Sequence, residues 1–260
     1  MTAALVETDS VPDLLLRVLS LRYSSWSIRP WLALTEAGAP VSVETVEIED
    51  LAAQGVDTGP ALTSISDPQL MRRRAQGSIT GLFPVLWVEG KPIHESLAIC
   101  EWTAEAFPEA RLWPEDAIER ARARAVSCEM VAGFQQLRTH MSCNVFARVP
   151  KQIRSTALER DIKRVLEIWR GSLDASGGPF LFGRFSIADC MYFPVLTRFQ
   201  TYGVELDSHA EAYAQALESH GTIEEWRRVA LTAPSIPVYD EAIRRLGGDV
   251  EAGRPRKELR

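Results

Sequence analysis

The pattern of apolar residues changes near residue 110, and this change constrains the fold more than any other feature of the chain. Before it, short apolar runs of strand length alternate with helical segments, whereas only helical spacing follows it. The runs that predict strands are residues 14–21, 41–48, 84–88 and 92–94, and the segments that predict helices are residues 29–37 and 96–107. This β-α-β then β-β-α order predicts an α/β arrangement around a small mixed sheet.

The second half of the chain reads as helices only. Apolar residues recur at spacings of three and four over residues 118–132, 158–173, 187–200 and 223–231. Two prolines, Pro108 and Pro114, interrupt the helical pattern between the halves. We therefore expect two domains, residues 12–107 and 114–246, with flexible termini at residues 1–11 and 247–260.

The charge balance limits the partners of the chain. Lys and Arg number 29 and Asp and Glu number 35, which gives a formal net charge of −6 at pH 7. Because polyanions bind to basic surfaces, we expect neither a nucleic-acid partner nor an anionic membrane surface. No apolar stretch approaches the ~18 residues of a membrane span, and residues 1–12 carry no basic residue, so a secretory signal is not expected.

The four cysteines (Cys100, Cys128, Cys143 and Cys190) are scattered, without a C-x-x-C pair or a Cys/His cluster. This spacing predicts neither a metal site nor a disulfide framework, and it favours a reducing, cytoplasmic location.

Serine is concentrated in the loop after the first strand, where Ser24, Ser25 and Ser27 precede a helix. The start of a helix stabilises an anion such as a thiolate, and a hydroxyl there can donate a hydrogen bond to sulfur. We expect Ser27 to cap the helix and another serine to contact the ligand. The loop contains no His or Asp to complete a triad, so the pattern does not favour a serine nucleophile.

Two later segments could bind a peptide-like ligand. Pro84 opens an apolar run, and a cis Phe83–Pro84 bond would turn the Phe83 backbone groups outward, toward an extended peptide. Glu95 and Ser96 then stand at the start of a helix, where we expect Ser96 as the N-cap. Together they could hold the ammonium and carboxylate groups of an amino acid, or they could simply cap the helix.

Taken together, the chain resembles the cytosolic glutathione transferases, and within them a serine-type, zeta-like bacterial member. The matching motifs are the serine loop, S-x-T-G-x-x-P-V-L at residues 78–86, E-S-x-A-I at residues 95–99 and F-S-I-A-D at residues 185–189. The resemblance covers roughly residues 14–231. It implies a thioredoxin-like N-terminal domain that binds glutathione, an all-α C-terminal domain and a homodimer. Ser186 and Asp189 are expected to form a capping box, which is a folding element.

The resemblance also implies residue roles for glutathione as the co-substrate. Ser24 would hydrogen-bond the sulfur, with Ser25 as the nearest rival and Tyr23 as a further candidate, because some classes of the family use tyrosine. Phe83, beside a cis Pro84, would pair with the cysteinyl backbone. The γ-glutamyl group would be held by Glu95 and Ser96.

Some positions depart from the family pattern or stay unplaced. Trp26 stands where the zeta pattern S-S-C has a cysteine, which counts against maleylacetoacetate isomerisation. The residue that contacts the glycyl carboxylate is not placed, and the candidates are Arg72, Arg73 and Arg74. In the helical half, a mixed polar and aromatic segment indicates an electrophile pocket at His140, Asn144 and Arg148, or alternatively a solvated helix end.

We therefore predict a metal-independent glutathione transferase, in which the glutathione thiolate attacks a small electrophile. One alternative is a glutathione-dependent cis–trans isomerase of the maleylacetoacetate or maleylpyruvate type. Another is a non-catalytic glutathione-binding scaffold. A disulfide reductase is not favoured, because the serine loop contains no cysteine.

Overall fold

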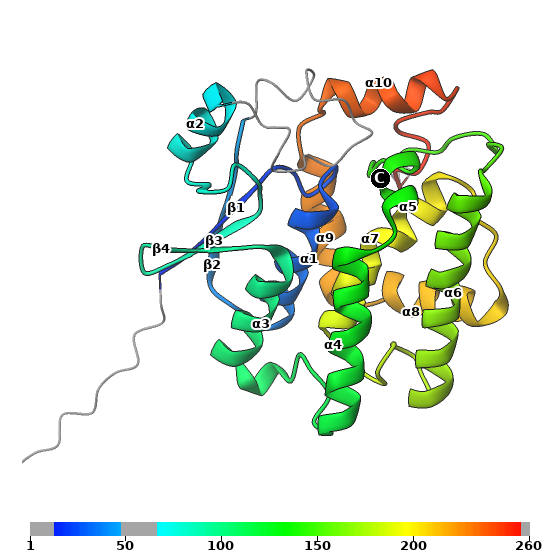
Figure 1. Ribbon diagram of the computed structural model, residues 1–260, viewed down its shortest axis with the longest axis horizontal. Coiled ribbons are helices and arrows are strands. Elements are labelled where there is room, and N and C mark those ends of the chain that lie inside the picture. The colour runs from blue at the N-terminus through cyan, green and yellow to red at the C-terminus, as the bar shows by residue number, and fades with distance from the viewer. Residues whose placement is uncertain (1–12, 48–66, 256–260) are drawn as a thin grey trace, which may run out of the picture.

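The computed structural model describes residues 13–47 and 67–255, and a small sheet lies beside a larger set of helices (Figure 1). The strands are β1 (Leu14–Val18), β2 (Val41–Thr45), β3 (Val85–Val88) and β4 (Lys91–His94). Their order in the sheet is β2-β1-β3-β4, with β1 parallel to β2 and antiparallel to β3. The four strands predicted from the sequence are confirmed, although β1 ends three residues earlier than predicted.

Alternation along β1 explains why this strand lies inside the sheet. Leu14, Leu16 and Val18 are buried, while Leu15 and Arg17 between them are half-buried. Helix α1 (Ser25–Glu36) connects β1 to β2, and α3 (Ser96–Ala106) follows β4. Helix α2 (Asp67–Ala75) lies in the polar stretch of residues 50–76, whose Gly and Pro residues predict a loop with one or two helical turns. Because α1 and α3 pack on each other, the N-termini of two helices can contribute to one site.

From residue 117 on, the described chain forms helices and no strand. These are α4 (Ala117–Ala132), α5 (Gln135–His140), α6 (Thr156–Ser176), α7 (Ile187–Thr201), α8 (Ser208–Glu218), α9 (Gly221–Thr232) and α10 (Pro237–Arg245), preceded by a short 3-10 turn at Pro108–Ala110. The helices predicted at α4, α6, α7 and α9 are confirmed. The sequence analysis did not predict α8 or α10.

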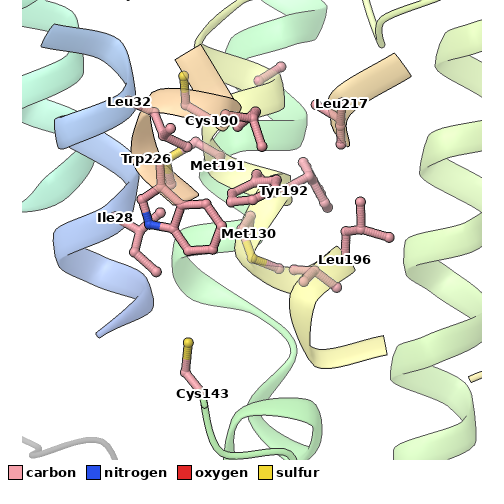
Figure 2. Packing of buried hydrophobic residues seen from close by; sticks show 14 of the residues in the cluster. Ile28, Leu32, Met130, Cys143, Cys190, Met191, Tyr192, Leu196, Leu217 and Trp226 are labelled. Carbon is pink, nitrogen blue, oxygen red and sulfur yellow. The ribbon is translucent and has the colours of Figure 1, made fainter. Parts of the chain in front are cut away.

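Helix α7 is the centre of the helical part and is buried almost throughout. It packs against α1, α4 and α8, and Figure 2 shows Ile28, Met130 and Trp226 gathered around it. The predicted capping box at its start is confirmed. Asp189 accepts hydrogen bonds from the Ser186 amide at 2.9 Å and the Tyr213 hydroxyl at 3.0 Å.

The C-terminal segment folds back onto the loop after β1. Arg22 donates to the Val250 carbonyl at 3.1 Å and pairs with Glu251 at 2.8 Å, and Arg148 exchanges two backbone hydrogen bonds of 2.8 Å with Asp249. The flexible tail expected from residue 247 stays a prediction, and these contacts within residues 247–255 count against it. A buried arginine and the paired backbone groups fix this glycine-rich segment.

Some expectations concern residues that the structure does not describe. They are the flexible termini at residues 1–11 and 256–260, and the part of the polar stretch at residues 50–66. In the described segments, no helix combines the length and apolarity needed to cross a bilayer.

Asp189 generates a stability prediction. Burial raises the pKa of Asp189 to about 6, despite the hydrogen bonds that it accepts. Since the ordinary pKa of Asp is about 3.9, the folded state binds the proton more tightly than the unfolded state between pH 4 and pH 6. This group therefore makes the protein less stable as the pH rises through that window, by about 3 kcal/mol for a shift of about two units.

The variant D189N lacks this titration. Urea unfolding from pH 4 to pH 7 should show the stability deficit of D189N shrinking as the pH rises, while the control E109Q, at an exposed position, follows the wild type. A deficit that stays constant across this range would contradict the prediction.

Candidate active site

Ser24 is the N-cap of α1, so the expectation that Ser27 has this role is wrong. The Ser24 Oγ accepts hydrogen bonds from the Ser27 amide at 3.3 Å and the Ser27 hydroxyl at 3.0 Å. Ser27 lies deeper and its Oγ accepts from the Leu19 amide at 3.2 Å. Because both acceptor positions of Ser24 are used, its own proton remains available, and no described residue accepts it.

Ser25 is bound to the helical half of the molecule. Its Oγ accepts a hydrogen bond of 3.1 Å from Nη2 of Arg198, which lies on α7. The same guanidinium donates from Nε to the Met141 carbonyl at 2.7 Å. Ser25 therefore connects the serine loop to α7, whereas the Ser24 hydroxyl bonds only to Ser27 within the start of α1.

Tyr23 points away from the start of α1 and toward α10. Its hydroxyl donates to Asp240 at 2.8 Å, and its ring packs on Tyr239 with centroids 5.4 Å apart. Burial raises the pKa of Tyr23 well above its ordinary value, and the bond to Asp240 adds to this effect. This hydroxyl fastens the C-terminal helix and is not placed to contact a ligand at Ser24.

The Phe83–Pro84 peptide bond is cis, as the sequence analysis expects. Phe83 lies just before β3, and its amide and carbonyl form no hydrogen bond with the described part of the chain. The Leu82 carbonyl beside it accepts a short bond of 2.5 Å from Ser78. Phe83 therefore offers one donor and one acceptor that an extended peptide could pair with.

Glu95, not Ser96, is the N-cap of α3, which corrects the sequence expectation. The Glu95 carboxylate accepts from the amides of Leu97 at 3.0 Å and Ala98 at 3.4 Å, with the backbone at φ 79°. Ser96 is buried and donates its hydroxyl to the Trp26 carbonyl at 2.8 Å. This bond joins the N-termini of α1 and α3, so Ser24 and Glu95 lie at the same end of two neighbouring helices.

The three residues expected to line an electrophile pocket have different environments. His140 is exposed at the end of α5. Asn144 is buried and donates to Asp240 at 2.9 Å, and Arg148 donates to the Ala147 carbonyl at 2.7 Å beneath the C-terminal segment. Their role in binding an electrophile stays a prediction.

The arginines proposed for the glycyl carboxylate lie on α2. Arg73 is buried and donates to the Gly81 carbonyl at 3.0 Å, and Arg74 donates to the Ile79 carbonyl at 3.1 Å. Both therefore hold the segment that leads to Phe83. Arg72 is exposed on the same helix.

Three arginines around Trp26 were not identified from the sequence. The guanidinium carbons of Arg29 and Arg138 lie 4.4 Å and 4.6 Å from the Trp26 ring centroid, and Arg198 completes the group through Ser25. None of the three forms an ion pair with a described residue. A charged residue inside an apolar helical run, such as Arg198 in residues 191–199, is the signal that could have revealed them.

Burial and mutual repulsion act on these arginines. Burial, together with the charges of Arg138 and Arg198, holds the pKa of Arg29 well below its ordinary value, and burial lowers the pKa of Arg138 to about 10. Three guanidiniums without a carboxylate partner make the surroundings of the α1 N-terminus a strongly cationic region.

The described chain also contains a cavity away from the serine loop. This cavity of about 590 Å³ opens between α6 and residues 203–207, but charged residues on its walls pair with one another, as Lys151 does with Glu205 and Arg170 with Asp207. Within residues 13–47 and 67–255, no three His, Cys, Asp or Glu side chains form a group that could hold a metal ion.

The mixed sheet with its cis-proline, joined to helices through a serine-capped α1, defines a thioredoxin-like domain followed by a helical domain. Family models agree, since "Glutathione S-transferase, N-terminal domain" matches residues 23–106 and "Glutathione S-transferase, C-terminal domain" matches residues 115–230. The chain belongs to the glutathione S-transferase family.

Curated relatives are similar over parts of the chain. A probable maleylacetoacetate isomerase of Caenorhabditis elegans is 46% identical over 54 residues, which is 21% of this chain and 25% of that protein. The maleylacetoacetate isomerase of Rattus norvegicus is 28% identical over 142 residues, covering 52% of this chain and 64% of that protein. The chain therefore matches between a quarter and about two thirds of the length of these relatives.

Solved structures share the fold at low sequence identity. A glutathione transferase homolog from Burkholderia gl BGR1 with bound glutathione has a TM-score of 0.60 at 19% identity, covering 83% of this chain and 97% of that one. A maleylacetoacetate isomerase from Anaeromyxobacter dehalogenans 2CP-1, with bound dicarboxyethyl glutathione and citrate in its active site, has a TM-score of 0.56 at 24% identity, covering 83% and 90%. These likenesses establish the fold.

The hydrogen bonds of Ser27 generate a second prediction. Replacing the buried Ser27 with alanine leaves the half-buried Leu19 amide without its acceptor and removes one donor to Ser24. The free energy of unfolding should fall by about 1–3 kcal/mol, the usual result of leaving a buried polar group unsatisfied. Urea denaturation measures the loss, and S208A, at an exposed position on α8, should change it by less than about 0.5 kcal/mol. Equal stability of both variants would contradict the role of Ser27.

Proposed function

We propose that the chain is a glutathione transferase in which Ser24 holds the glutathione thiolate for attack on a small electrophile. The observation that carries the proposal is the Ser24 hydroxyl, which accepts two hydrogen bonds and keeps its proton for a ligand at the start of α1. A hydroxyl that accepts hydrogen bonds is polarised toward donation, and the helix N-terminus adds positive potential.

The remaining contacts support binding of a γ-glutamyl tripeptide. Phe83 offers an unpaired amide and carbonyl for the cysteinyl backbone. Glu95 uses one carboxylate oxygen for the α3 amides, so its other oxygen can accept from the ligand ammonium. The Ser96 hydroxyl is occupied by Trp26, so its backbone amide would bind the γ-glutamyl carboxylate.

In the proposed reaction, the thiol loses its proton to solvent and the thiolate is stabilised by the Ser24 hydroxyl. The sulfur then forms a bond to the electrophilic carbon, and the negative charge passes to the electrophile or its leaving group. No metal is required for this step. The homodimer and the cytoplasmic location expected from the sequence stay predictions.

The variant S24A tests this role. A hydrogen bond to a charged group contributes about 1.5–3 kcal/mol, so S24A should lower turnover about tenfold to a hundredfold and change glutathione affinity little. The thiolate absorbance of bound glutathione should fall with it. The matched variant S25A should reduce turnover only about threefold, because Ser25 acts through its neighbour. A larger loss in S25A than in S24A would move the catalytic role to Ser25.

A second candidate is a glutathione-dependent cis–trans isomerase of maleyl-type diacids. Two observations favour it: the relatives named maleylacetoacetate isomerase, and the three arginines without a carboxylate partner near Trp26. Here the thiolate adds to a conjugated double bond, the single bond rotates, and the thiolate leaves again. Guanidiniums at the site would bind the carboxylates of such a substrate.

Glutathione consumption distinguishes the two reactions. With a maleyl-type diacid, an isomerase should form the fumaryl isomer without net loss of glutathione, whereas a transferase should consume one glutathione for each product. The measurement is product formation by chromatography together with free thiol remaining. Absence of both activities across electrophile classes, with a bound thiol that titrates normally, would support a non-catalytic scaffold.

A further inference from the structure

We propose that Arg198 of α7 is a positioning residue for the glutathione sulfur, fixing Ser25 and adding positive charge at the start of α1. This inference rests on the proposed function, since it concerns the thiolate that Ser24 would hold. It makes the helical domain a participant in glutathione activation and not only the wall of an electrophile pocket.

The contacts of Arg198 place its charge beside the serine loop. The side chain is only 7% exposed, and its three nitrogens donate to Ser25 Oγ at 3.1 Å, the Met141 carbonyl at 2.7 Å and the Pro194 carbonyl at 3.4 Å. All three acceptors are neutral. No carboxylate therefore offsets the guanidinium charge through these contacts, in a place where little water screens it.

Two further arginines add to the positive potential around Arg198, and two acidic groups oppose it. Arg29 on α1 and Arg138 on α5 both respond to the charge of Arg198, which lowers their pKa values. The acidic groups that act on this cluster are Glu95, which acts on Arg29, and Asp161, which acts on Arg138. The remaining titratable groups near Arg198 are neutral at pH 7: Cys143, Tyr202 and Tyr239.

The buried side chain of Arg29 has an unsatisfied hydrogen-bond donor in the same region. Its side chain is 1% exposed, and its Nη1 is buried without a hydrogen-bond partner in the described chain. Its Nε and Nη2 donate to the Met191 carbonyl and the Met130 sulfur, both at 3.0 Å. A buried guanidinium nitrogen without an acceptor, next to two other cations, indicates a region that is completed by an anion.

A protein sulfur in the same region responds to the same charges. Cys143 lies between Met141 and Asn144, whose carbonyls are held by Arg198 and Thr201 of α7, and Figure 2 shows its sulfur directed toward the buried cluster. Burial raises the pKa of the Cys143 thiol, while the charges of Arg198 and Arg29 act in the opposite direction. A glutathione thiol beside Ser24 would meet the same charges with less burial.

The test is a titration of the bound glutathione thiol by thiolate absorbance in the full-length protein. The variant R198M keeps the apolar stem of the side chain and removes the charge. Its bound thiol should titrate about one pH unit higher than in the wild type, a tenfold loss of thiolate at a fixed pH. The Michaelis constant for glutathione should change less than threefold, and R198K should restore most of the thiolate.

A matched control distinguishes the effect of the Arg198 charge on the thiol from the effect of the overall charge of the protein. R164Q removes the same charge from the exposed face of α6, where Arg164 pairs with Glu129, and should leave the thiol titration unchanged. If R198M does not fold by circular dichroism, S25A decides. It breaks the Arg198 contact, and the bound thiol should then titrate about half a unit higher, matching its threefold loss of turnover.

The outcomes are distinguishable. A wild-type protein whose bound thiol titrates as in free glutathione overturns both the proposed function and this inference. A wild type with a lowered thiol pKa, together with an R198M (or, if that variant is unfolded, an S25A) that titrates identically, overturns only the role of Arg198.

Discussion

The start of α1 is the point on which the rest of the site depends. Four consecutive residues there each take part in a hydrogen bond, and three of them bond to another helix. The bonds run from Tyr23 to Asp240 on α10, from Ser27 within α1 to Ser24, from Arg198 on α7 to Ser25, and from Ser96 on α3 to Trp26. Three of these partners lie more than sixty residues away along the chain, so this helix start is fixed only when both domains are folded together. The helix dipole and the free hydroxyl of Ser24 are thereby held in one orientation.

Cations surround this helix start where a stable core would normally place apolar or paired groups. Burying Arg29 and Arg198 without carboxylates is unfavourable in itself, and repulsion among the three guanidiniums adds to the penalty. Local violations of core-packing rules concentrate at functional sites, because a ligand supplies the missing partner. The overall charge of −6 does not conflict with this, since the positive charges are confined to one interior region.

The elements that depend on local pattern could be predicted from the sequence, and the contacts between domains could not. Alternation predicted the strands, and the Ser186–Asp189 spacing predicted a capping box that the structure confirms. The choice of cap failed at both helix starts. Ser24 and Ser27 are the same residue type, so composition does not separate them, and at the start of α3 the carboxylate of Glu95 takes the place of serine, the residue type that N-caps prefer. The Arg198–Ser25 bond spans 173 residues, and no short-range pattern reports a pair so distant.

The position of Cys143 close to the serine loop follows from the fold and could not be predicted from the sequence. Trp26 stands where the zeta pattern has a cysteine, so the serine loop itself contains no thiol. The structure nevertheless brings Cys143 of the helical domain to the region of Ser25 and Arg198. Its burial outweighs the neighbouring charges, so its pKa is raised and the thiol stays protonated at neutral pH. A protonated, 3% exposed thiol is a poor nucleophile. Under the proposed function the reactive sulfur is therefore that of the ligand, because the fold keeps the one protein sulfur of this region buried and neutral.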